Sequence, residues 1–169
     1  MRDDKWLFAK LDEIWDNHFP DVPQDNDVKI IWGRRARNRL GSIKQSSISN
    51  FQFSKNIKSK NKNYKKDHPV TVITINSLFK DLKIPEFVVI STIAHELTHY
   101  AHGFNSPLEQ KFETPHAGGI IDKEMDSRGL REVRLEAKKW LKEHWKNYIL
   151  KNFPPKARRA KRRKIIIWR

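Results

Sequence analysis

The 169-residue chain contains no cysteine, and no apolar run in it approaches the ~20 residues that a membrane-spanning helix needs. The lack of cysteine fits a reducing compartment, where disulfides are rare. The first residues are charged and then amphipathic, without the apolar core of a signal peptide. These absences exclude a membrane span and lead us to expect a cytoplasmic protein.

Acidic residues are few compared with basic ones. The chain has 35 Lys and Arg against 20 Asp and Glu, which gives a formal net charge of +15. Such an excess favours a polyanionic partner, and we expect nucleic acid and a nucleoid-associated location in the cytoplasm. The hydrophobic fraction of 37% argues against global disorder, and the length supports one domain with a core.

The basic residues are concentrated in two segments. Residues 33–39 contain four arginines, and eight of the fourteen residues in 156–169 are Lys or Arg. We therefore predict a folded domain over residues 1–153 and a basic C-terminal tail over residues 154–169. The apolar Ile165–Trp168 segment is expected to dock on the domain. The predicted DNA-contacting residues are Arg34, Arg35, Arg37, Arg39, Arg158, Arg159, Arg162 and Arg163.

The pattern of apolar residues predicts an α+β fold. Helical spacing is expected near residues 4–18, after Pro85, over 120–128 and over 130–150. Strands are expected at 28–32, 40–43, 48–53 and 70–75, with an exposed polar loop over 55–66. We expect a small, mostly antiparallel sheet packed against the helix that follows Pro85 and against flanking helices.

That helix contains the most informative motif, His95-Glu96-Leu97-Thr98-His99. Random ordering of this composition would give about 0.015 matches to H-E-x-x-H. Histidines four residues apart lie on one helix face and can bind one metal ion, for which zinc is the first expectation. Glu96 is displaced by one residue, where it can accept a proton from water.

A catalytic zinc site needs a third protein ligand and an open position. His116 follows a polar segment that lets the chain turn back, and it precedes small residues. His102 continues the helical stripe but lies ~10.5 Å along the axis from His95, so we interpret it as exposed or structural rather than as a ligand. The extended pattern H-E-x-x-H-x-x-G-x-x-H fails, because His102 and Asn105 occupy its glycine and final histidine positions. The competing third ligands are Glu124, Glu132, Glu136, Asp122 and Asp126.

The chain resembles the SprT-like (Spartan-type) zinc metalloproteases over approximately residues 5–130. The similar segments are Val28–Trp32 with the basic turn to Gly41, Val70–Ile75, the His95–His99 motif, and His116-Ala117-Gly118-Gly119 with Met125. Ala117 stands where that family usually has glycine, and the cysteine zinc ribbon of many members is absent.

The resemblance implies zinc bound by His95, His99 and His116, with Glu96 as catalytic base. It also implies a zincin-like fold and hydrolysis of DNA-associated or DNA-crosslinked proteins. Two alternatives are a basic DNA-binding module with a structural or degenerate zinc site, and a small zincin with a glutamate ligand and no DNA role. Arg128, Arg131 and Tyr100 are candidates for stabilising an oxyanion.

Overall fold

The computed structural model describes residues 1–46 and 69–153. The elements in chain order are α1 (Asp4–His18), β1 (Val28–Trp32), β2 (Gly41–Ser46), β3 (Val70–Ile75), the 3-10 turn η2 (Ser77–Lys80), α2 (Glu86–Ala101), the 3-10 turn η3 (Ala117–Gly119), α3 (Ile120–Ser127), α4 (Arg131–Trp140), the π-helical turn η4 (Leu141–Trp145) and α5 (Lys146–Asn152). The strand predicted at 48–53, the loop predicted at 55–66 and the tail lie outside the described residues.

The sheet has three strands in the order β1-β3-β2. β1 pairs with β3 in parallel, whereas β2 pairs with β3 in antiparallel register from Gly41 opposite Ile75 to Ser46 opposite Val70. The α+β class is therefore confirmed, but the expected mostly antiparallel sheet is wrong, because the sheet is mixed. The alternation of apolar residues marks a strand but does not encode the direction of its neighbour.

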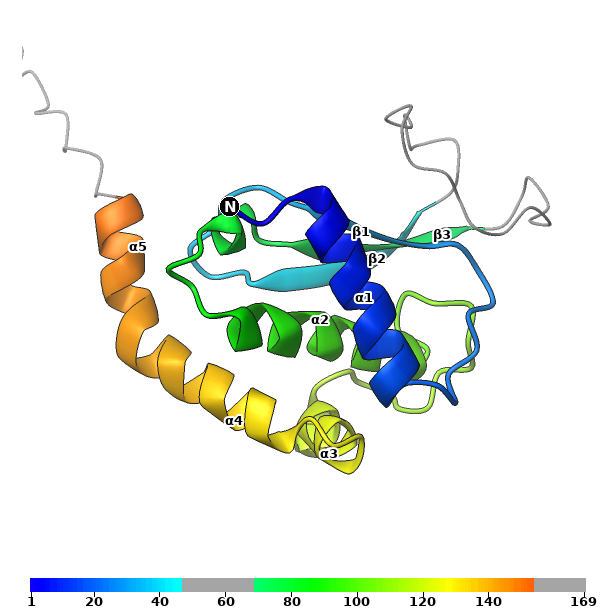
Figure 1. The fold of residues 1–169 in the computed structure, drawn as a ribbon. Helices are drawn as coiled ribbons and strands as arrows, with labels where there is room; N and C mark the ends of the chain where they lie inside the picture. The colour runs from blue at the N-terminus through cyan, green and yellow to red at the C-terminus, as the bar shows by residue number, and fades with distance from the viewer. Residues whose placement is uncertain (47–68, 154–169) are drawn as a thin grey trace, which may run out of the picture.

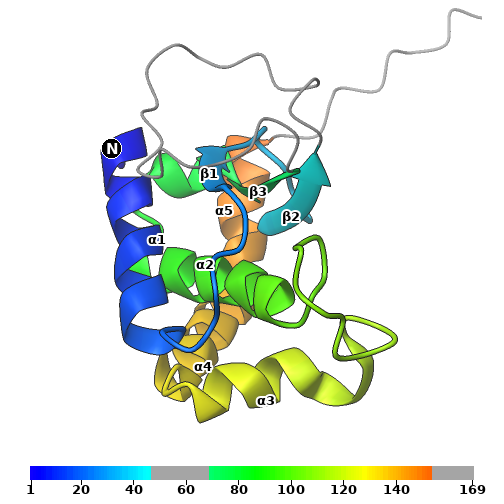
Figure 2. The ribbon, with the colours of Figure 1, turned by 90° about the vertical axis from the view of Figure 1, so that its right-hand side faces the viewer.

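α2 runs along the sheet, and α1 lies beside α2 and β1 (Figures 1 and 2). The β3 residues Ile73 and Ile75 and the α2 residues Val88, Val89 and Ile93 are fully buried in one core. α2 begins after Pro85, whose fixed φ suits a helix start, and it is followed by Gly103 at φ 80°. Burial on several sides fixes the rotation of α2, and so the direction in which its histidines project.

The C-terminal helices α4, η4 and α5 follow one another without a break and form a curved helical rod at the edge of the fold (Figure 1). The single helix predicted over 130–150 is confirmed in extent, with the π-helical turn Leu141–Trp145 between α4 and α5. The Trp145 indole donates a hydrogen bond to the Arg37 carbonyl at 2.9 Å, which fastens this rod to the arginine-rich segment after β1. None of the helices in the described ranges is long and apolar enough to cross a membrane.

Candidate metal centre

His95 and His99 project from the same face of α2, as their spacing predicts. Their Nε2 atoms are 3.2 Å apart. Tetrahedral ligands with metal–nitrogen bonds of ~2.0–2.1 Å would be about 3.4 Å apart, so this pair already has the separation of two ligands of one ion. His99 is buried and His95 is half-buried, since the core side of α2 packs on the sheet.

The structure brings His116 to the same place. One nitrogen atom from each of His95, His99 and His116 lies within 4.8 Å of the other two, and no other His, Asp or Glu cluster of this kind occurs in residues 1–46 and 69–153. The His116 ring stacks on His95 at 5.5 Å and meets His99 edge-on at 4.8 Å between ring centroids. His116 is exposed, so the cluster is open on one side.

Two glycines carry the chain from His116 into α3. Gly118 and Gly119 have φ values of 61° and 68°, in the left-handed region that favours glycine. A Cβ atom added to either glycine would meet nothing within 4 Å. These glycines are therefore needed for their backbone conformation. The close approach of another segment, which the sequence suggested as the reason for small residues here, does not occur among the described residues.

The three imidazoles suit a divalent metal of intermediate softness such as zinc. Burial lowers the pKa of His95 to about 4, and it lowers the pKa of His99 to about 3, with further contributions from the neighbouring histidines. Both rings are consequently neutral at pH 7, which is the protonation state that binds metal. The donor set fits zinc with three protein ligands and one position left for water or substrate.

Glu96 lies beside the histidine cluster and is 5% exposed. Burial raises its pKa to about 7, and the positive charge of Arg39 opposes this rise. The carboxylate is pressed against β2: a Cβ atom on Gly41 would be 2.6 Å from Glu96 Oε1 and 2.9 Å from the Thr92 methyl. Gly41 is therefore required so that β2 can approach the carboxylate, and the sequence signal for this was only a glycine at the start of a strand.

Two cavities meet at Glu96. One, of about 460 Å³, extends toward α4, and the other, of about 500 Å³, extends along β2 toward Phe104 and Pro115. Both are lined by Arg39, Gly41, His95 and Glu96. Glu96 and His95 therefore lie where the two cavities adjoin, and His99 and His116 line only the cavity along β2.

His102 lies apart from this cluster and is 1% exposed. We expected His102 to be either exposed or structural; it is not exposed, and its enclosed position beside Glu124 fits a structural role. His102 Nε2 lies 3.6 Å from a Glu124 oxygen, and neither ring nitrogen has a hydrogen-bond partner within the described residues. The other Glu124 oxygen accepts a hydrogen bond from Arg128 at 2.8 Å. Glu124 is thus placed with His102 and Arg128 rather than with His95, His99 and His116.

Of the oxyanion candidates, two are engaged elsewhere. The Tyr100 hydroxyl is buried and donates to Asn26 at 3.0 Å. Arg128 donates to both oxygens of Asp21 and to the His18 carbonyl, tying α3 to the end of α1. Arg131, at the start of α4, lines neither cavity of the cleft. Arg39, which the sequence placed only among the predicted DNA-contacting residues, is a cation of the cleft.

The four arginines after β1 are exposed, but they do not face one way. Arg35 and Arg37 lie over the Phe153 ring, at 5.0 and 5.5 Å from its centroid. Arg39 points into the cleft instead. Arg158, Arg159, Arg162 and Arg163 lie outside the described residues.

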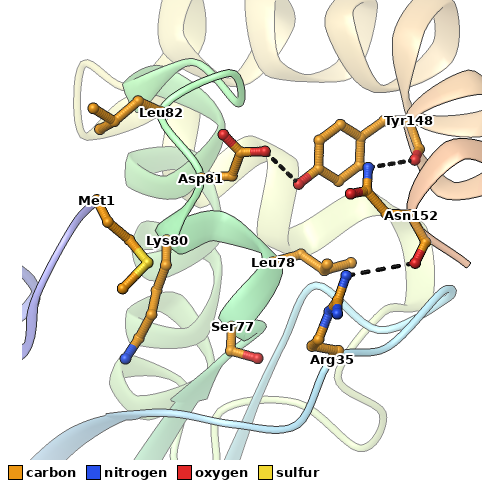
Figure 3. A pocket seen from close by; sticks show the side chains of 9 residues that line it. All are labelled: Met1, Arg35, Ser77, Leu78, Lys80, Asp81, Leu82, Tyr148 and Asn152. Carbon is orange, nitrogen blue, oxygen red and sulfur yellow. Dashed lines mark hydrogen bonds between the residues drawn. The ribbon is translucent and has the colours of Figure 1, made fainter.

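A third cavity, of about 580 Å³, lies between η2 and α5, away from the histidines (Figure 3). Two of its polar side chains, Tyr148 and Arg35, are held in structural contacts. The Tyr148 hydroxyl donates to Asp81 at 2.9 Å, and Arg35 reaches the Asn152 carbonyl at 3.5 Å (Figure 3). Burial raises the pKa of Tyr148 to about 12, so it remains a donor at any ordinary pH. The cavity therefore offers no candidate chemistry.

Comparison with known proteins adds no constraint on this site. No protein-family model matches the chain, and searches of the curated proteins and of the solved structures returned no match.

Proposed function

We propose that this chain is a zinc-dependent endopeptidase. The observation that carries the proposal is the convergence of His95, His99 and His116 within 4.8 Å, with the buried carboxylate of Glu96 next to them. Three imidazoles and an open side are typical of a catalytic zinc site rather than a closed structural one. The SprT-like resemblance points to the same chemistry.

Zinc bound by the three histidines would act as a Lewis acid toward a peptide carbonyl and toward water. Glu96 would accept the proton of the attacking water and then donate it to the leaving amine.

The shape of the cleft supports cleavage within a chain rather than at its end. Cavities extend from Glu96 in both directions, and β2 forms an edge of the described sheet beside them. An extended peptide could add to this edge through backbone hydrogen bonds, which is how many proteins hold peptide strands. The substrate would then continue beyond the scissile bond on both sides.

DNA-associated or DNA-crosslinked proteins are the proposed substrates. The support is the net charge of +15 and the exposure of Arg34, Arg35, Arg37 and Arg39. Phosphate contacts need only such charges, without sequence readout. The substrate class rests on the resemblance and on charge, whereas the peptidase chemistry rests on the histidine cluster.

The decisive experiment compares wild type with Glu96→Gln. The variant is expected to bind one zinc per chain and to lose cleavage of casein and of a histone. Equal cleavage by the two proteins would exclude Glu96 as the base. Bound metal without peptidase activity, with or without DNA, would favour a DNA-binding module with a structural zinc site.

Metal content identifies the third ligand. His116→Ala is expected to lose zinc at concentrations that saturate the wild type, whereas Glu124→Ala and Glu132→Ala are expected to retain it. Zinc lost from Glu124→Ala or Glu132→Ala but kept in His116→Ala would assign the site to the zincin class with a glutamate ligand.

A further inference from the structure

The cavity between Glu96 and α4 has apolar walls and a basic rim. Its apolar lining comes from Leu40, Val88, Ala137 and Leu141, which belong to three different parts of the fold. A volume of about 460 Å³ falls within the ~300–1,000 Å³ of pockets that take small ligands, so a long side chain fits with room for water. The walls therefore suit the methylene groups of a bound side chain.

The charged groups around this cavity are unequally paired. Arg134 donates to Asp122 at 3.0 Å and to both oxygens of Asp126 at 2.8 Å, so its charge is neutralised by its own neighbours. Arg39 and Lys138 also line the cavity, and neither forms an ion pair with a carboxylate in the part of the chain that the structure describes. Among the described residues, these two cations are without an ion-pair partner at the rim, and the carboxylates in the lining are Glu96, which Arg39 influences through its charge, and Asp122, which Arg134 binds.

The acids of α4 and η4 lie away from this rim. Glu132, Glu136 and Glu143 are spaced by four and seven residues, so they share a helix face with Lys139. Lys138 is rotated by one residue, toward the cavity and the buried Ala137. Adjacent lysines of one helix therefore face different surroundings, which makes Lys139 a natural control for Lys138.

We propose that this cavity is the substrate subsite that sets cleavage specificity, and that it accepts an acidic side chain with an aliphatic stem, glutamate above all, next to the scissile bond. This rests on the proposed peptidase function. Apolar walls would cover the methylene groups, while Arg39 and Lys138 would bind the carboxylate at the rim. A lysine or arginine side chain would meet the same two cations, and of the two acids that line the cavity Asp122 is already bound by Arg134, so the site would disfavour basic residues.

Such a subsite would determine which segments of a protein substrate are cleaved. A chain with an excess of positive charge would be drawn to DNA and to proteins held on it, and those proteins are themselves rich in basic segments. The subsite would direct cleavage away from such segments and toward their acidic or apolar stretches. Attraction to DNA and choice of scissile bond would then depend on different groups of the enzyme, apart from Arg39, which would serve both.

The test uses the full-length zinc-loaded protein and a randomised peptide mixture whose cut sites are mapped by mass spectrometry. Matched peptides then carry Glu, Gln, Leu or Lys at the position that shows the preference. We expect kcat/KM for the Glu peptide to exceed that for the isosteric Gln peptide by about tenfold, the effect of one ion pair near a protein surface. The Lys peptide should be the poorest substrate.

Lys138→Glu should invert the ratio of Glu to Lys cleavage, whereas Lys139→Glu should leave that ratio as in the wild type. A ratio that is unchanged in Lys138→Glu, or that changes equally in the two variants, overturns the proposal. Both lysines are exposed, so neither substitution is expected to prevent folding.

Binding separates this proposal from the peptidase proposal. Fluorescence anisotropy of the labelled Glu, Gln and Lys peptides is measured on zinc-loaded Glu96→Gln protein, where no peptide is cut. Cleavage by wild type without charge preference overturns the subsite but leaves the peptidase. Binding that prefers Glu and depends on Lys138, without cleavage by wild type, supports the subsite and overturns hydrolysis. Absence of both overturns both.

Discussion

Replacing Gly41 with alanine tests whether the position of the Glu96 carboxylate governs catalysis. An ideal Cβ at residue 41 would lie 2.6 Å from Glu96 Oε1, whereas ordinary van der Waals contact begins at 3.4 Å. The carboxylate must therefore withdraw by 3.4 − 2.6 = 0.8 Å. The Thr92 methyl, at 2.9 Å from the same Cβ, blocks part of the space into which the chains could relax.

A displacement of this size should impair chemistry far more than folding. Misplacing a catalytic group by ~1 Å costs on the order of 100-fold in rate, so we expect kcat to fall by about 30- to 100-fold in Gly41→Ala. Glu96 is a flexible side chain that can yield, and the cost in stability should remain within the ~1–3 kcal/mol of an overpacked site. Zinc content should be unchanged, because the three atoms nearest to a Cβ at residue 41 belong to Glu96 and Thr92 and to none of the three histidines.

Gly33→Ala is the matched control. Its Cβ would crowd the Thr74 methyl at least as severely, but Glu96 is not among its three nearest neighbours. We expect it to lower the melting temperature and to leave kcat per folded molecule close to wild type. The assay is steady-state peptide hydrolysis with thermal unfolding and metal analysis on the same samples. Wild-type kcat in Gly41→Ala, or equal loss of kcat in both variants, would refute the argument from the carboxylate position.

Three further predictions follow from the same contacts. In metal-free protein, the folded-state pKa of Glu96 is raised to about 7 from 4.5, so the folded state holds a proton there that the unfolded state releases between pH 4.5 and 7. The burial of Glu96 therefore lowers the free energy of unfolding progressively as pH rises through this window, by about 3 kcal/mol in total. In urea unfolding of chelator-treated proteins, the stability of Glu96→Gln relative to wild type should increase from pH 5 to pH 8. A stability difference that is constant with pH would contradict this. Arg128→Ala should lower the free energy of unfolding by ~2–4 kcal/mol, because it leaves Glu124 and Asp21 without their shared partner, while exposed Arg131→Ala should cost under ~0.5 kcal/mol in the same denaturation series. Deleting residues 156–169 should reduce the slope of log affinity for DNA against log salt concentration, measured by anisotropy, and an unchanged slope would remove the tail from the DNA interface.

Local rules were sufficient for the elements that carry the chemistry. The 3.6-residue period fixes His95 and His99 on one face, and Pro85 and Gly103 mark where the helix begins and ends, so this half of the site follows from the sequence alone. The same period gives α1 and the long C-terminal rod. These features depend on neighbours in the chain, and such interactions act over a few residues only.

Strand direction and the identity of long-range neighbours depended on the fold. β3 enters between β1 and β2, which makes the sheet mixed, and no pattern within a strand specifies this order. His116 was the preferred third ligand from the sequence, and Glu124 was a competing candidate. The turn at Gly118 and Gly119 places His116 with the other histidines and sends Glu124 toward His102 and Arg128.

The motif that the sequence determined is a helix with two histidines on one face, spaced as metal ligands, and a glutamate beside them. Tertiary structure alone decided that Glu96 is buried against Gly41, that His102 is enclosed, and that Arg39 faces the cleft while Arg35 and Arg37 face Phe153. The physical reason is that pKa, burial and ion pairing are set by groups from several elements that meet only when the core packs. A residue's type and spacing fix what it can do, whereas its packed surroundings fix its charge state and its partners.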